Sequence, residues 1–538
     1  MKKDTFIKGA FISTICIVIS KILGIIYVIP FHAIIGEQGG ALYSYAYNIY
    51  ALFLNLSTVG IPLAISKIVS EYNALSYHDV KKRAYRLAML ITSITAILST
   101  IILLIFAYPL AQLIKGGVEG GNSLEDIAFV IRISASAILF VTILSNMRGY
   151  LQGQKYIKAS SISQVVEQFV RIIVILAGSF VFMKLYGLKE AVGAAVFGAT
   201  VGAILALIYL YLKAPKELTL KRPEKILDEE NNITNSYLSK KIITYTIPFI
   251  IMSIIVSLYN SIDMITVIKT LVNKLHYPTL DAEYIMSCIA TWGAKLNVIV
   301  TSIASGLVVS LLPNITSDYA LKNHEGIRNK TIKALQILLV LVIPMVAGLS
   351  FLAEPVWTIF YGNNLLGSSV FKMSIFTALF SSLFLNLNVI MQSVNRYKQV
   401  YLSLSLGLLF KIIFNIPLMI LFHNINLPAY YGATIATILG YIVSITMNLI
   451  DLKKLFHINY KTVFKTFSYA ILSTIIMILI LYVFNIVLPF TNLTKMKSIL
   501  LIIVYAFIGI IIYFTIMWKT GILENLFGKQ ISKIVKRK

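Results

Sequence analysis

The stretch SILLIIVYAFIGIIIYFTIMW, residues 498–518, contains no Asp, Glu, Lys or Arg. A helix of about 20 apolar residues is long enough to cross the hydrocarbon core of a bilayer. Similar runs recur along the 538-residue chain, which is 58% hydrophobic and only 13% charged. A soluble domain carries about 25% charged residues. The composition therefore excludes an ordinary water-soluble protein and predicts an all-α polytopic membrane protein.

Apolar runs between polar breaks predict fourteen membrane spans. They lie at 8–32, 41–66, 86–112, 127–148, 160–183, 189–212, 242–262, 284–312, 332–353, 371–393, 400–422, 429–450, 465–489 and 498–518. An even number of spans places both ends of the chain on the same side of the membrane.

The net charge of +25 comes from 47 Lys and Arg against 22 Asp and Glu. These cations gather in alternate loops, for example at 81–86, 213–225 and 533–538. Cytoplasmic loops of membrane proteins collect Lys and Arg, so both termini are expected in the cytoplasm. The basic balance therefore does not indicate a nucleic-acid partner.

A long polar insert predicts the division of the chain. We expect an N-terminal six-helix lobe at 1–213, a cytoplasmic linker at 214–241, a C-terminal six-helix lobe at 242–455, and two further helices with a basic tail at 456–538. Short matches support two related halves: SEY at 70–72 with SDY at 317–319, and LQG at 151–153 with MQS at 391–393. Transporters built from parallel repeats bind substrate near the midplane, between the repeats.

Charged residues inside predicted spans are the first candidates for a site. Lys21, Lys295 and Lys411 have no acidic neighbour at helical spacing, whereas Glu167 and Arg171 lie four residues apart and can pair. Each buried charge costs about 2.5–3.5 kcal/mol on insertion scales, so such residues are functional candidates. An uncompensated positive balance predicts an anionic substrate. The alternatives are a self-neutralising Glu–Arg pair and lysines that extend to the interface.

Uncharged polar residues and one further acid complete the candidate set. Asn55, Asn260 and Asn297 could hydrogen-bond a sugar or phosphate, or tie helices together. Asn386 and Asn388 have the same two interpretations, and Asp263 is either a ligand or a solvated residue near a helix end. No catalytic or metal-binding constellation and no phosphate-binding loop is present. We therefore expect no cofactor, and energy from an ion gradient or the membrane potential.

Several motifs resemble the MurJ/YtgP group of Gram-positive bacteria and its sporulation relatives. They are IIYVIPFHAIIG at 25–36, GIPLAISK at 60–67, RGYLQGQ at 148–154 and SQVVEQFVR at 163–171. The resemblance implies the MOP exporter fold, with two six-helix lobes around a central cavity in a MATE-like arrangement. It also implies two extra C-terminal helices that form a lipid-binding groove.

The activity implied by the resemblance is flipping of lipid II, an undecaprenyl-pyrophosphate-linked saccharide-peptide, to the outer leaflet for peptidoglycan synthesis. In the group, a cationic cavity engages the pyrophosphate. Lys21, in SKILG at 20–24, stands where Gram-negative members have arginine, and Lys295 lies within about one residue of an essential arginine. Asn55 stands in place of another arginine, and Tyr27-Val28 in place of an Arg-Asp pair.

The expected setting is a bacterial plasma membrane, with lipid II or a related glycolipid, membrane lipids and wall-synthesis machinery as partners. Three alternatives stay open. They are a flippase for another polyprenyl-linked oligosaccharide (capsular, teichoic-type or sporulation-related), a cation-coupled multidrug exporter, and a scaffold for wall-synthesis enzymes. The drug exporter predicts acids deep in the cavity, where this chain has lysines.

Overall fold

A computed structural model describes residues 6–58, 60–214, 218 and 228–527 of the chain. The described residues form helices joined by short connections, with no β-strand among them. They divide into two compact units, Met1–Ser287 and Cys288–Lys538. The predicted all-helical membrane fold is therefore confirmed.

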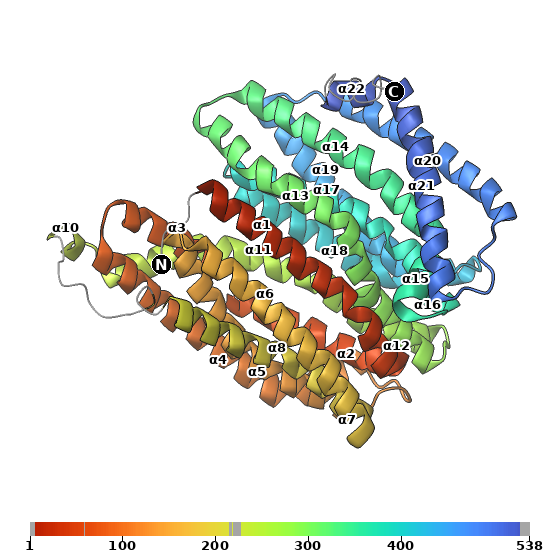
Figure 1. Cartoon of the computed structure of the whole chain (residues 1–538), viewed down its shortest axis with the longest axis horizontal. Coiled ribbons are helices and arrows are strands. Elements are labelled where there is room, and N and C mark those ends of the chain that lie inside the picture. Colours follow the sequence, from red (N-terminus) through yellow and green to blue (C-terminus); the bar gives the residue numbers. More distant parts are fainter. Residues whose placement is uncertain (1–5, 59, 215–217, 219–227, 528–538) are drawn as a thin grey trace. The chain divides into compact units, whose positions relative to one another are not determined.

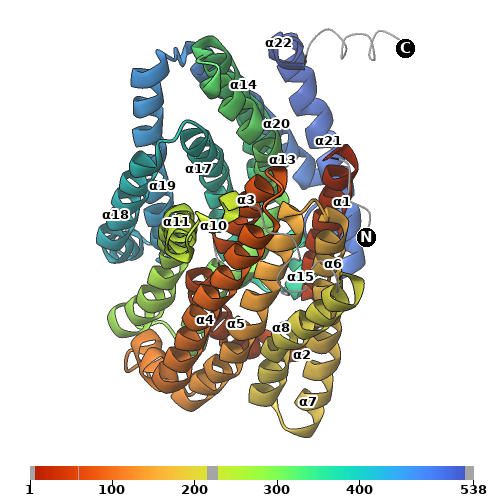
Figure 2. The same cartoon turned by 90° about the vertical axis from the view of Figure 1, so that its left-hand side faces the viewer.

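The first unit contains the helices coloured red to yellow-green in Figure 1. They are α1 (Phe6–Ile26), α2 (Val28–Thr58), α3 (Ile61–Ala74), α4 (His78–Lys115), α5 (Leu124–Gly153), α6 (Ile157–Ile173), α7 (Ser179–Leu185), α8 (Leu188–Lys213), α10 (Asp228–Asn231), α11 (Asn235–Lys269) and α12 (Thr279–Ser287). Two π-helical turns, η1 (Val174–Gly178) and η2 (Thr270–Lys274), interrupt this series. Figure 2 shows α4, α5 and α8 packed side by side.

The second unit begins with a third π-helical turn, η3 (Cys288–Trp292), and continues to the blue end of the chain in Figure 1. Its helices are α13 (Gly293–Ala320), α14 (His324–Phe351), α15 (Ala353–Tyr361), α16 (Leu365–Ser374), α17 (Phe376–Ser393), α18 (Tyr397–Asn424), α19 (Tyr430–Phe456), α20 (Lys461–Val487), α21 (Lys495–Lys519) and α22 (Ile522–Phe527).

Thirteen described segments are long and apolar enough to cross a membrane, one fewer than the fourteen predicted. The difference lies at the start, where α1 and α2 adjoin at Tyr27 and the stretch Ile19–Thr58 counts as one candidate that overlaps the predicted spans 8–32 and 41–66. Gly36 interrupts that segment with a left-handed backbone (φ 65°, ψ −169°), which glycine adopts without steric cost. The predicted polar break between the two spans therefore exists as a glycine break within α2.

Helix ends follow ordinary capping chemistry. The Ser123 side chain accepts a hydrogen bond from the Asp126 amide at the start of α5, and Thr234 does the same for Tyr237 at the start of α11. Asn323 caps α14 in the same way. Such caps satisfy backbone donors that have no partner within the helix.

The described end of the predicted linker packs on the start of α4. The Glu230 carboxylate accepts hydrogen bonds from the Asp79 and Val80 amides at 2.8 and 3.0 Å. Arg83 donates to the Glu230 and Ile233 carbonyls. The rest of the linker, at 215–217 and 219–227, and the basic tail lie outside the described residues. The division into six, six and two helices stays a prediction.

Close helix contacts in the first unit depend on glycine. A Cβ on Gly149 of α5 would lie 2.5 Å from the Pro62 carbonyl oxygen, and one on Gly202 of α8 would lie 2.7 Å from the Glu167 carbonyl oxygen. Small residues let membrane helices approach this closely. These contacts fix α5 and α6, which carry the charged side chains described next.

Candidate functional site

A polar cavity of about 430 Å³ lies in the first unit between α1, α5 and α6. Its lining consists only of polar side chains: Ser20, Lys21, Arg148, Gln164, Glu167 and Gln168. We call this cavity the Lys21 cavity. Within a membrane-spanning unit, polar side chains are expensive to bury and gather at substrate or ion pathways.

Arg148 is the most firmly oriented cation of the Lys21 cavity. Its Nη1 donates to Glu167 Oε2 at 2.7 Å, and its Nε donates to Ser163 Oγ at 2.7 Å. Its Nη2 is buried and has no hydrogen-bond partner within the described part of the chain, and the same holds for Ser20 Oγ. The guanidinium is therefore held on two sides beside the cavity, and one of its nitrogens is buried without a described partner.

Lys21 adds a second positive charge. Its side chain is half-buried and forms no ion pair or hydrogen bond with any residue that the structure describes. Lys21 and Arg148 outweigh the single acid Glu167, so the cavity carries one net positive charge. Ammonium and guanidinium donors suit an oxyanion such as a phosphate.

The alternative of a self-neutralising pair between Glu167 and Arg171 is absent from the described residues. Both residues lie on α6, but Glu167 pairs with Arg148 of α5 at 2.7 Å. Arg171 forms no ion pair within the described ranges and lies in a separate small cavity with Tyr43, Tyr47, Tyr50, Val196 and Ala199. The four-residue spacing along α6 permits an ion pair between Glu167 and Arg171. In the structure, however, the Glu167 carboxylate pairs with Arg148 of the neighbouring helix α5.

Lys295 belongs to the second unit, on α13. Its Nζ lies 4.5 Å from the ring centroid of Trp292, a cation–π distance. Trp292 is fully buried, and its backbone carbonyl accepts a hydrogen bond from the Tyr361 hydroxyl at 2.9 Å. The ammonium of Lys295 is therefore held against an anchored aromatic ring.

Lys411 does not extend to an interface, because its side chain is fully buried. Its Nζ donates to Thr437 Oγ1 at 2.8 Å, from α18 to α19. Asp263 on α11 is also buried, at 3% exposure, so it is not the solvated residue that one interpretation predicted.

The asparagines mostly tie helices together. Asn55 donates to Ser257 Oγ at 2.9 Å, and Asn297 donates to Thr377 Oγ1 at 3.1 Å. Asn386 donates to the Ala304 carbonyl, and Asn388 accepts from Asn448. Asn260 differs from these residues because its side chain is exposed.

Sequence reasoning missed Ser20, Arg148, Gln164 and Gln168 as site residues. Arg148 lies at the end of the predicted span 127–148, where an arginine is ordinarily assigned to the interface. Glu167 could have pointed to Arg148, because an acid inside a predicted span needs a cation nearby, and that cation can come from a neighbouring helix.

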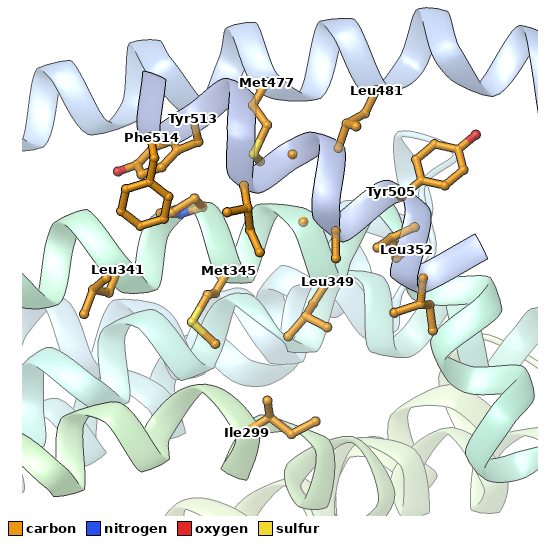
Figure 3. A pocket seen from close by; sticks show the side chains of 16 residues that line it. Ile299, Leu341, Met345, Leu349, Leu352, Met477, Leu481, Tyr505, Tyr513 and Phe514 are labelled. Carbon is orange, nitrogen blue, oxygen red and sulfur yellow. The ribbon is translucent and has the colours of Figure 1, made fainter. Parts of the chain in front are cut away.

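The second unit contains a cavity of a different kind, of about 350 Å³ (Figure 3). Apolar side chains from α13, α14, α20 and α21 surround it, including Ile299, Met345, Leu349, Met477, Leu481 and Phe514. Tyr505 and Tyr513 also line it, but their hydroxyls donate to the Leu488 and Val340 carbonyls. The cavity, which we call the apolar groove, therefore suits a hydrocarbon chain.

Comparisons of the sequence and of the fold with known proteins identify similar membrane transporters. The family model described as polysaccharide biosynthesis protein matches residues 6–317. Lipid II flippase MurJ of Bacillus subtilis (strain 168) is 31% identical over 98% of this chain and 97% of its own length. A solved structure of lipid II flippase MurJ, in an inward closed conformation, has a TM-score of 0.67 at 15% identity, covering 96% of this chain and 100% of that one. An inward-facing multidrug resistance MATE family transporter of the MOP superfamily has a TM-score of 0.63 at 11% identity, covering 83% and 98%.

The structural likenesses show the fold, and the family model and the Bacillus relative show the family. The resemblance predicted from the motifs is thereby confirmed, as is the prediction of a multi-pass bacterial membrane protein. The chain belongs to the polysaccharide biosynthesis protein family and to the MurJ-like flippases, which are transporters rather than enzymes.

Proposed function

We propose that this flippase carries lipid II, a polyprenyl-diphosphate-linked saccharide, from the inner to the outer leaflet by alternating access. The observation that carries the proposal is the Lys21 cavity, which combines a net positive charge with donors that have no partner among the described residues. The substrate named for the Bacillus relative has the diphosphate that such a cavity would take.

The head group would be held by charge and by hydrogen bonds together. Arg148 Nη2 and Ser20 Oγ are buried donors without described partners, and Lys21 supplies an ammonium group. A buried donor without a partner loses about 1–3 kcal/mol relative to a satisfied one. A diphosphate oxygen would therefore gain from filling this position. Its own burial would be compensated by the two cations.

The other residues predicted to bind the substrate remain part of the proposal, although fewer contacts in the structure support their roles. Lys295, Arg171 and Asn55 stay predicted substrate ligands, and Glu167, Asn260, Asp263, Asn297 and Lys411 stay secondary candidates. Glu167 has a definite role in the proposal, because it orients Arg148.

The apolar groove is the proposed place for the polyprenyl tail. It is lined almost entirely by carbon and lies partly on α20 and α21, the two helices predicted to follow the six-helix lobes. A polyprenyl chain gains about 0.8 kcal/mol per buried CH₂ when it leaves water, but little when it leaves lipid. The groove would therefore guide the tail and add little affinity. The proposal also includes the predicted topology, in which both termini lie in the cytoplasm and two six-helix lobes are followed by two further helices.

A flippase for another lipid-linked glycan is the second candidate. A capsular or teichoic-type precursor carries the same diphosphate, and the Lys21 cavity recognises that group rather than the sugar. A cation-coupled drug exporter is less well supported, because the acid of the cavity, Glu167, is already paired with Arg148.

The test is growth of a bacterium whose essential lipid II flippase has been depleted and replaced by this chain. The expected result is normal growth, with labelled lipid II accessible on the outer face. A well-expressed chain that leaves lipid II confined to the inner leaflet would contradict the substrate. Normal transport of a capsular precursor in the same cells would then favour the second candidate.

A further inference from the structure

An open cavity of about 650 Å³, lined by basic, polar and apolar side chains, lies at the connection between α19 and α20. Its lining comes from the end of one predicted span and the start of the next: Lys453, His457, Ile458, Asn459, Tyr460, Lys461 and Phe464. We call it the Lys453 cavity. None of these residues enters the proposed transport site.

The charge of the Lys453 cavity is not compensated locally. Lys453 and Lys461 are exposed, and neither forms an ion pair with any residue of the described ranges. The nearest acid along the chain, Asp451, receives hydrogen bonds from Arg396 Nη2 and Nε at 2.8 and 3.0 Å. That carboxylate is therefore occupied, and the two lysines are left for a ligand.

The cavity lies at the boundary between water and hydrocarbon, because α19 and α20 are both membrane-spanning candidates and meet there. Phe464, one turn into α20, is 69% exposed. The Tyr460 hydroxyl donates to the Leu449 carbonyl at 3.0 Å and fixes the turn. Lysines at the water side and an exposed phenyl ring one turn deeper match the layers of a phospholipid, with its phosphate above its acyl chains.

We propose that the Lys453 cavity binds the phosphate of an anionic glycerophospholipid of the bilayer. Basic pockets at the ends of membrane helices bind anionic head groups, with each Lys or Arg contributing to the attraction. Lys453 and Lys461 contact the phosphate, His457 and Asn459 contact the head-group hydroxyls, and Phe464 packs on the acyl chain.

This lipid is separate from the proposed substrate tail, although both touch α20. Met477 and Leu481 of the apolar groove lie at least 16 residues beyond Lys461, which corresponds to about 24 Å at 1.5 Å per residue. The two ligands therefore occupy different halves of one helix. The bound lipid would hold one end of α20 while the other end contacts the tail.

The test uses native mass spectrometry of the full chain in detergent, with phosphatidylglycerol or phosphatidylcholine added. The wild type should retain phosphatidylglycerol and not phosphatidylcholine. The double variant Lys453→Gln/Lys461→Gln should weaken phosphatidylglycerol binding about tenfold or more, since two cations are lost. Lys454→Gln/Lys465→Gln is the matched control, because it removes the same charge nearby from exposed residues that do not line the cavity. The control should stay within about twofold of the wild type.

Equal loss in both double variants would overturn the proposal, because it would indicate general surface charge. Loss of added lipid II from Lys453→Gln/Lys461→Gln but not from the control variant would assign the cavity to the substrate and also overturn the proposal. Displacement of the phosphatidylglycerol by millimolar inorganic phosphate alone would indicate a free-ion site and would also overturn the proposal. The assay measures no translocation, so its result is independent of the proposed transport function. If the first double variant failed to fold, the single Lys461→Gln variant would be compared with Lys465→Gln in the same assay.

Discussion

Arg148 of α5 donates from Nη1 to Glu167 Oε2 of α6 at 2.7 Å, and both side chains are 11% exposed. The acid neutralises the arginine and leaves one buried nitrogen, Nη2, directed to no described partner. Such an arrangement orients a permanent cation without consuming all of its donors. It is the geometric basis of the proposed head-group site.

Replacing Arg148 tests its role as a ligand. Arg148→Gln should lower lipid II translocation about tenfold or more, because hydrogen bonds to charged groups contribute about 1.5–3 kcal/mol. Arg148→Lys keeps the charge but loses the fork that contacts Glu167 and Ser163 together, so it should recover only part of the activity. Translocation in reconstituted vesicles is the measurement. Full activity of Arg148→Gln would remove this residue from the site.

Replacing Lys21 by Arg or by Gln tests whether translocation depends on the positive charge of this side chain. Lys21→Arg should retain most translocation, whereas Lys21→Gln should reduce it severalfold, because the cavity would lose its net positive charge. Lys189→Gln is the control, since Lys189 is half-buried outside the Lys21 cavity and contacts Asp126 at 3.8 Å, Glu190 at 3.5 Å and the Phe129 ring. An identical response of Lys21→Gln and Lys189→Gln would show that the cavity charge is irrelevant.

Replacing Glu167 tests its role as a positioning residue. Breaking a buried ion pair from one side costs about 3–5 kcal/mol, so Glu167→Ala should lower the melting temperature in detergent markedly. Glu167→Gln keeps an acceptor for Arg148 and should melt closer to the wild type. The two variants should also differ in lipid II binding, with Glu167→Gln retaining it. Equal stability of the two variants contradicts the positioning role.

Gly149→Ala tests the helix contact that places Arg148. The new Cβ would lie 2.5 Å from the Pro62 carbonyl oxygen, and this backbone atom cannot move away without shifting α3. We therefore expect the free energy of unfolding to fall by about 1–3 kcal/mol. Gly306→Ala on α13 is the control, because nothing lies within 4 Å of its Cβ position. That change should be neutral or stabilising by up to about 1 kcal/mol. Equal melting temperatures for the two variants would contradict the predicted backbone clash.

Filling the apolar groove tests the proposed tail site. Ala506→Phe places a ring among its lining residues, whereas Ile503→Phe alters a 64% exposed position on the same helix. The first change should slow translocation of long-chain lipid II more than that of a short-chain analogue, and the second should change neither rate. Equal rates for the two chain lengths in Ala506→Phe would argue against a tail in the groove.

Much of the fold was predictable, because apolar runs report membrane helices directly. The all-helical class, the family and the membrane spans after the first two were predicted correctly. The count differed by one, since α1 and α2 adjoin at Tyr27 and the break at Gly36 lies inside α2. The sequence around Gly36 does not indicate whether the helix continues through the glycine or ends there.

The site was harder to predict, because its contacts join helices whose relative rotation is absent from the sequence. The spacing of Glu167 and Arg171 was visible, but the approach of Arg148 from α5 depends on the Gly149 contact with α3. The burial of Lys411 similarly depends on how α18 packs against α19. Lys21 was identified correctly as lacking an acidic neighbour along its own helix, and it lines the polar cavity.

The most direct test of the proposed site is equilibrium binding of undecaprenyl diphosphate to the purified chain and to the double variant Lys21→Gln/Arg148→Gln. The Lys21 cavity predicts binding to the wild type, weaker binding of undecaprenyl monophosphate, and loss of preference between the two lipids in the double variant. Unchanged affinity and unchanged preference in a folded double variant would contradict it.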